Sequence, residues 1–185
     1  NKQLRQLLSS SKDLGGDFIV AQLLVVLKKI SSIEIIINKG KKYDLYLGQP
    51  VLDGFGVVGQ VVGVYDEIAR VQLLTDQKSA IPVQVANSGI RAIIRGTGKF
   101  NELDLIDISQ PEKLHLGDLL LTSALGLQSN AGYPVGVVKA IDKIANNNWI
   151  IKVTPTAHLN SNNNFLLVWP EHSHWLQSLQ RLNLS

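Results

Sequence analysis

The sequence predicts an all-β fold of two tandem six-stranded β-barrel domains, preceded by a short N-terminal helix. Two observations support this prediction. From residue 18 onward almost every segment is short, apolar and rich in β-branched residues, with turn-forming residues between the segments. In addition, motifs of the first half of the chain recur in the second half in the same order. Because no long internal helix is available to cover a sheet, we expect the sheets to close on themselves.

The first element, assigned to residues 1–14, has one apolar helical stripe. Leu4, Leu7 and Leu8 stand at i, i+3 and i+4 among polar residues. A stripe of two turns fits a short helix packed on its own domain or the end of a coiled coil, and the leucine pair favours the coiled coil.

Strand-like segments follow one another to residue 169. They cover residues 18–27, 33–38, 50–53, 56–64, 70–75, 80–86, 90–96, 102–108, 119–123, 135–141, 149–154 and 165–169. Turns such as Asn87-Ser88-Gly89 and Asn146-Asn147-Asn148 separate them. This spacing of short strands and turns is typical of a barrel or sandwich.

An internal repeat divides the chain into two related modules. Residues 46–52 match 115–121, residues 56–62 match 132–138, residues 69–75 match 148–154, and residues 81–85 match 165–169. Four matches in order predict two six-stranded modules, with a first barrel at 17–87 and a second at 88–170. Residues 171–185 form a C-terminal tail with helical spacing of its apolar residues. The repeat leaves open whether the last strand closes its own module or crosses back to the first.

A glycine-rich stretch, Gly54-x-Gly56-x-x-Gly59, has the spacing of a dinucleotide-binding fingerprint. The fingerprint requires a helix after the glycines, but Gln60-Val61-Val62-Gly63-Val64 favours a strand. We therefore expect these glycines to allow bends and close backbone approaches in the barrels. The expected structural barrel-turn residues are Gly48, Gly56, Gly59, Gly117, Gly132, Pro134 and Gly136.

The composition excludes several function classes. Cysteine is absent from the 185 residues, which excludes disulfides, cysteine nucleophiles and cysteine-ligated zinc. The net charge of +3 is small, and Lys39, Lys41 and Lys42 are typical of a solvated loop. No nucleic-acid-binding motif is present, so we expect no nucleic-acid partner. Methionine is also absent, so we expect the natural start to lie upstream.

The sequence offers no convincing catalytic, cofactor or metal site. A serine protease would need His115, then Asp118 or Asp142, then Ser161, and Ser161 lies in an asparagine-rich loop. His172 and His174 lie beyond the last predicted strand with one adjacent acid. We therefore expect a non-enzymatic protein without cofactors.

An ordered set of short motifs resembles one known family. The motifs are INKG at 37–40, GQPV at 48–51, GVVGQV at 56–61, LLTD at 73–76, AIPV at 80–83, GDLL at 117–120 and GYPVG at 132–136. Together they resemble the MreC family of bacterial rod-shape-determining proteins over residues 4–169.

This resemblance implies a scaffold of the cell-elongation machinery, on the periplasmic or extracytoplasmic face of the inner membrane and anchored by a single upstream membrane helix. It implies self-association as a dimer or filament and binding to the class B penicillin-binding transpeptidase and to the MreD, RodZ and MreB complex. Dimerisation carried over from the family points to Leu4, Leu7 and Leu8. The alternative is another periplasmic β-barrel adaptor, a subunit of an envelope transport complex.

Overall fold

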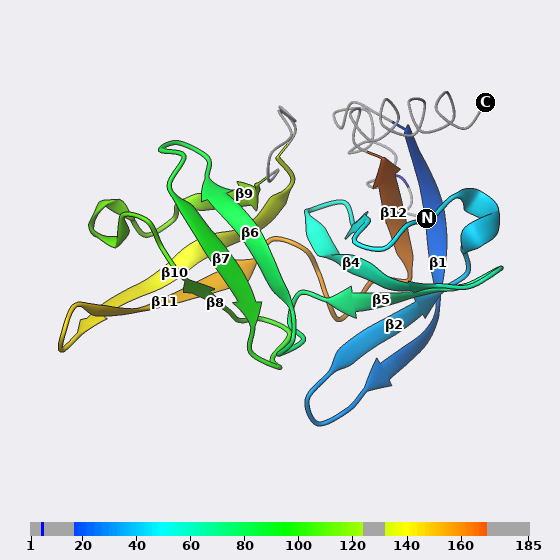
Figure 1. The fold of residues 1–185 in the computed structure, drawn as a ribbon, viewed down its shortest axis with the longest axis horizontal. Coiled ribbons are helices and arrows are strands. Elements are labelled where there is room, and N and C mark those ends of the chain that lie inside the picture. Colours follow the sequence, from blue (N-terminus) through cyan, green and yellow to red (C-terminus); the bar gives the residue numbers. More distant parts are fainter. Residues whose placement is uncertain (1–4, 6–16, 124–131, 170–185) are drawn as a thin grey trace, which may run out of the picture.

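The computed structural model describes residue 5, residues 17–123 and residues 132–169, and these residues form two β-barrels (Figure 1). The described part contains twelve strands and two short 3-10 helices. The strands are β1 (Asp17–Lys28), β2 (Ile33–Ile37), β3 (Pro50–Leu52), β4 (Val57–Val64), β5 (Ala69–Leu73), β6 (Ala80–Val85), β7 (Arg91–Gly96), β8 (Leu103–Ile106), β9 (Leu119–Thr122), β10 (Pro134–Ile144), β11 (Asn148–Pro155) and β12 (Asn164–Trp169). The 3-10 helices are η1 (Lys41–Tyr43) and η2 (Pro111–Lys113).

Each barrel is closed by six antiparallel strands. The first barrel has the order β1-β12-β3-β4-β5-β2, and the second has the order β10-β11-β8-β7-β6-β9. The all-β prediction with two six-stranded barrels is therefore confirmed. The predicted helix with Leu4, Leu7 and Leu8, and the tail of residues 171–185, lie outside the described residues.

Alternating burial along the strands gives each barrel its own core. In β2 and β5 every second residue is buried, as expected for a strand with one face inward. Ile35, Ile37 and Val71 lie in the core of the first barrel. Ile94, Leu105 and Val153 lie in the core of the second.

The last strand of each repeat unit lies in the other barrel. β6 follows β5 in sequence but pairs with β7 and β9 of the second barrel. β12 follows β11 but pairs with β1 and β3 of the first barrel, as Figure 1 shows by its position beside β1. The barrel limits predicted at 17–87 and 88–170 are thus corrected, because β6 and β12 are exchanged between the two units.

The repeat is nevertheless visible in the order of the strands. Walking round the first barrel from β3 gives β4, β5, β2, β1 and β12, and the same walk from β9 gives β10, β11, β8, β7 and β6. The matched segments 81–85 and 165–169 therefore hold equivalent positions in opposite barrels. Neither barrel is complete without a strand from the other repeat unit.

β12 is buried on both faces because it lies between the two cores. Phe165, Leu167 and Trp169 belong to the core of the first barrel. Leu166 and Val168 belong to the cluster that contains the core of the second. A strand buried on both faces reads as a continuous apolar run, and residues 165–169 have the sequence FLLVW.

The turn before β3 is repeated before β9 with the same hydrogen bonds. The Gly48 N–H donates to the carbonyl oxygen of Val61, and the Gly117 N–H donates to that of Val138, each at 2.8 Å. Both glycines have a positive φ, 84° and 86°, which other residues rarely adopt. This turn is the structural counterpart of the first sequence match.

Candidate interaction surface

The potential catalytic residues lie in different elements: His115 and Asp118 in the turn before β9, Asp142 on β10, and Ser161 in the connection between β11 and β12. The backbone N–H of His115 donates to the Asp118 carboxylate in the turn before β9, which is a local contact within four residues. The described residues contain no group of three or more His, Asp or Glu side chains able to hold a metal ion. His172 and His174 lie outside the described residues.

The glycine-rich stretch leads into a strand and not into a helix, as the sequence predicts. β4 starts at Val57, directly after Gly56. A Cβ atom on Gly59 would overlap the backbone oxygen of Gln72 in β5, and one on Gly56 would overlap the backbone oxygen of Pro134. Gly132 and Gly136 make similarly close approaches, to Leu121 and Val153 respectively. Gly56 and Pro134 therefore bring the two barrels into direct backbone contact.

Asp53 joins the two halves of the chain at this junction. Its Oδ1 accepts hydrogen bonds from the backbone N–H groups of Phe55 and Gly56 at 2.8 and 3.0 Å. Its Oδ2 accepts from the backbone N–H of His158, at 2.7 Å, and from the side-chain amide of Asn162. Asp53 is 4% exposed, and these four bonds compensate the removal of its carboxylate from water.

Aromatic rings reinforce the same junction. The rings of Phe55 and His158 are stacked with centroids 4.1 Å apart and planes 11° from parallel. Burial raises the pKa of the Tyr133 phenol to about 12, and the nearby Tyr46 adds to the effect. Burial also raises the pKa of Tyr46 itself. Both phenols are therefore neutral at physiological pH.

A second buried carboxylate fixes the connection from β5 to β6. Asp76 is fully buried and accepts hydrogen bonds from the backbone N–H groups of Ile33 and Lys78, at 2.9 and 2.8 Å. A Cβ atom on Gly96 would overlap the backbone oxygen of Asp76. These close contacts connect the β1–β2 hairpin to the point where the chain enters the second barrel.

The β1–β2 hairpin carries the main apolar surface of the described residues. It extends beyond the rest of the first barrel (Figure 1) and ends in the turn before Ile33. Its exposed apolar side chains are Leu24, Val25, Val26, Leu27 and Ile30, and Ile30 is completely exposed. Consecutive residues of a strand point to opposite faces, so both faces of the hairpin are apolar. Exposed apolar surface of this extent is typical of interaction sites.

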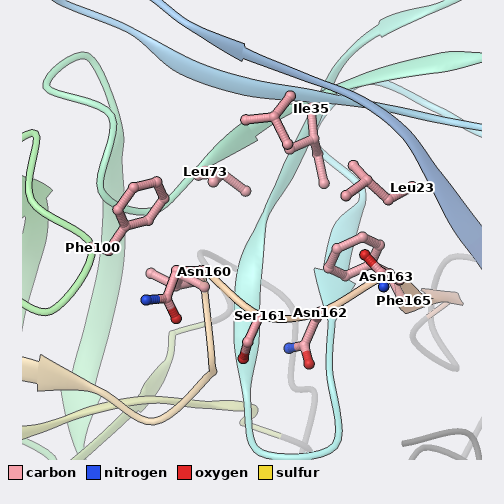
Figure 2. Close-up of a pocket in the computed structure, with 11 residues that line it drawn as sticks. Leu23, Ile35, Leu73, Phe100, Asn160, Ser161, Asn162, Asn163 and Phe165 are labelled. Atoms are coloured by element: carbon pink, nitrogen blue, oxygen red, sulfur yellow. The ribbon is translucent and has the colours of Figure 1, made fainter.

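A pocket of about 460 Å³ lies beside this hairpin (Figure 2). Leu23 and Val26 of β1 line it, together with residues 159–163 of the β11–β12 connection. Ile35, Leu73 and Phe165 line it from the core of the first barrel, and Phe100 lines it from the loop between β7 and β8. The pocket is therefore apolar at its base and has an asparagine-rich rim.

The charged groove on the second barrel is compensated internally. Asp104 accepts a 2.6 Å hydrogen bond from the Lys152 ammonium and lies 3.6 Å from the Arg95 guanidinium. This hydrogen bond raises the pKa of Lys152 above its ordinary value. Lys99 pairs with Glu102 at the same groove. The groove holds near-balanced charge and lacks the excess of one sign that would attract a charged ligand.

Sequence reasoning missed the hairpin surface and the Asp53 junction. The sequence predicts a strand at residues 18–27, but apolar character alone does not distinguish a buried strand from an exposed interaction surface. The sequence predicts Asp53 only as the end of a strand, since its partners His158 and Asn162 are 105 and 109 positions away. The useful signal was the uninterrupted run Leu23 to Leu27, which is too apolar for a solvated edge strand.

Comparison with known proteins identifies the family. The family model described as "Rod shape-determining protein MreC, barrel core" matches residues 26–169. The chain belongs to the MreC family. Motif resemblance, repeat and fold all agree with this membership.

Curated MreC proteins resemble the chain over most of its length. It is 40% identical to the cell shape-determining protein MreC of Haemophilus influenzae over 173 residues, 93% of this chain and 49% of that protein. It is 36% identical to MreC of Escherichia coli over 170 residues, 91% of this chain and 46% of that protein. The chain thus spans about half the length of these relatives.

Solved structures of MreC proteins share the fold. One described as MreC has a TM-score of 0.83 at 39% identity, covering 91% of this chain and 97% of its own. MreC from Pseudomonas aeruginosa has a TM-score of 0.75 at 40% identity, covering 83% and 99%. The fold also matches a "Complex between Penicillin-Binding Protein (PBP2) and MreC from Helicobacter pylori", with a TM-score of 0.62 at 19% identity, covering 82% and 97%. Among the described residues of the present chain, no helix has the length and apolar character of a membrane span.

Proposed function

We propose that this chain is the barrel region of a non-enzymatic scaffold of the bacterial cell-elongation complex. In this role it maintains rod shape by self-associating and by binding the peptidoglycan transpeptidase, with MreD, RodZ and MreB as further partners. It acts on the periplasmic face of the inner membrane, to which an upstream segment anchors it. Membership of a cell-shape-determining family supports the proposal.

The observation that carries the proposal is the exposed apolar hairpin on a body of two barrels joined by exchanged strands. Leu24, Val25 and Val26 are about half exposed, although each would contribute about 1.5–3 kcal/mol if fully buried. Packing these side chains against another protein would remove their apolar surface from water and so stabilise the complex. The exchanged strands and the Asp53 junction hold the barrels together, so the hairpin is presented from a fixed support.

The transpeptidase is the partner we assign to this surface. A fold relative is described in complex with a penicillin-binding protein, which gives that class of partner a precedent within the fold. A scaffold needs no catalytic group of its own, and the carboxylates of Asp118, Asp104 and Asp53 serve a turn, an ion pair and the junction, respectively. Its contribution to peptidoglycan synthesis is then to hold an enzyme in place.

Calorimetric titration with the extracytoplasmic domain of the class B transpeptidase of the same organism tests the proposal. The 185-residue chain should bind saturably, and Leu24→Lys should weaken binding at least tenfold by placing a charge in the apolar contact. Ile144→Lys is the matched control, because Ile144 is an equally exposed apolar residue at the far hairpin of the second barrel. Absence of binding, or equal loss in both variants, would contradict the assignment of this surface.

A further inference from the structure

One edge of β1 is open next to the apolar pocket. Residues 17–22 of β1 pair with β12, and residues 23–28 pair with β2 on the opposite side. β12 begins at Asn164, opposite Gln22, so it does not extend along the second half of β1. Within the described ranges no strand pairs with residues 24–28 on that side.

The hydrogen bonds of the hairpin show which residues face the open edge. Lys28 lies opposite Ile33, whose N–H donates away from β1 to Asp76. The Lys28–Ile33 pair is therefore a non-hydrogen-bonded pair, and the backbone groups of Lys28 point outward. Because this direction alternates along a strand, Val26 also points outward, whereas Leu27 and Val25 point to β2.

The pocket adjoins this edge on the side where Val26 lies. Val26 lines the pocket, and the Lys28 ammonium lies over the Phe100 ring at 5.2 Å from its centroid. Lys28 and Lys29 take part in none of the ion pairs among the described residues. An added strand would therefore meet free backbone groups, an apolar recess and two lysines that take part in no ion pair in the described part of the chain.

We propose that the open edge of β1 binds an extended peptide segment by strand addition. The segment continues the line of β12 antiparallel to β1, places alternate apolar side chains over the pocket and carries an acidic residue opposite Lys28 or Lys29. The backbone of Val26 and Lys28 supplies the hydrogen bonds, and the recess selects the side chains. The inference rests on the proposed scaffold function only for the source of the segment, a partner protein.

The occupant is a single extended segment because the recess is bounded on both sides. Residues 160–163 lie across the pocket from β1, and Phe100 closes one end (Figure 2). The Asn163 carbonyl accepts the N–H of Leu23 at 2.8 Å, so the asparagine-rich segment is held close to the start of the open edge. A recess bounded in this way suits a single extended segment that runs beside β1.

Binding of a designed peptide to the 185-residue chain tests the inference. The probe is acetyl-Glu-Val-Thr-Val-Thr-Val-Glu-amide, and its partner probe carries an N-methyl group on the central Val. Strand addition predicts that N-methylation weakens binding at least tenfold, since it removes one backbone donor and leaves the side chains unchanged. Amide hydrogen exchange of Val26 and Lys28 should slow at least tenfold on binding.

A substitution in the chain provides the second readout. Val26→Lys should lower the affinity for the unmethylated peptide at least tenfold, and Ile144→Lys should change this affinity less than twofold. Equal binding of the methylated peptide, or unchanged exchange at Val26 and Lys28, would overturn the inference. Concentration-dependent dimerisation that Val26→Lys abolishes, without peptide binding, would overturn it in favour of a second copy. If Val26→Lys leaves transpeptidase binding intact, the open edge of β1 is not the binding site, and the proposed scaffold function still stands.

Discussion

The Asp53 carboxylate accepts the backbone N–H of His158 at 2.7 Å, which joins the β3–β4 turn to the β11–β12 connection. This bond orients the connection that returns the chain from the second barrel to the first. The start of β12 is thereby held where it closes the first barrel and bounds the apolar pocket. Local turn chemistry and the exchange of strands between barrels thus depend on the same side chain.

Asp53→Asn should destabilise the chain by about 2–4 kcal/mol. The side-chain NH₂ group of asparagine would face donors from His158 and Asn162, or those from Phe55 and Gly56, and two donors would lose their acceptor. Urea unfolding measures the change. Asp142→Asn is the matched control, since Asp142 is exposed on β10 and should shift the unfolding free energy by less than about 0.5 kcal/mol. Equal effects of the two substitutions would show that the Asp53 carboxylate does not stabilise the junction.

Gly59→Ala should destabilise the first barrel by at least about 2 kcal/mol, because the new methyl group would overlap the Gln72 backbone and force β4 from β5. Gly63→Ala in the same strand is the control. Its Cβ would lie 3.4 Å from the nearest atoms, an ordinary contact, and alanine loses less backbone entropy than glycine on folding. We expect a change between zero and about 0.5 kcal/mol of stabilisation for Gly63→Ala in thermal unfolding. A larger loss at Gly63 than at Gly59 would contradict the close approach of β4 and β5.

The strands and turns were predictable because their signals are local. Alternating burial in β2 and β5 follows from alternating residue types, and the turns at Gly48 and Gly117 require glycine at a positive φ. The repeat was recognisable because two copies of one turn need the same residues in the same order. Each of these signals is contained in the residue types of a single strand or turn.

The exchange of β6 and β12 could not be predicted because the two strands hold equivalent positions in the strand orders of the two barrels. Either strand is apolar enough for either position, so the pairing depends on contacts far apart in sequence. The sequence does contain one partial clue. Residues 165–169 are apolar without interruption, whereas β6 includes Pro82 and Gln84, and only β12 is buried on both faces.

Truncation after Asn163 should unfold the first barrel. Removing β12 deletes six paired positions with β1 and two with β3, and it takes Phe165, Leu167 and Trp169 from the core. Hydrogen exchange should show loss of protection in residues 17–22 and in β3, together with a reduced β signal in circular dichroism. Truncation after Trp169 is the control and should preserve this protection, since it retains β12. Unchanged protection after both truncations would mean that β12 does not close the barrel in solution.

Tyr133→Phe should improve stability at alkaline pH. Burial raises the pKa of the folded-state phenol to about 12, whereas the unfolded chain has the ordinary value of 10.0. The folded state therefore retains the proton longer, and its stability is complete below pH 10 and declines as the pH rises through 12. Tyr133 accounts for up to about 2 kcal/mol of this decline.

Urea unfolding between pH 9 and 12 should show a smaller decline in stability for Tyr133→Phe than for the unchanged chain. Tyr65→Phe is the control, because Tyr65 is half-exposed, and it should follow the unchanged chain. Parallel curves for all three proteins would show that the Tyr133 phenol reaches water in the folded state.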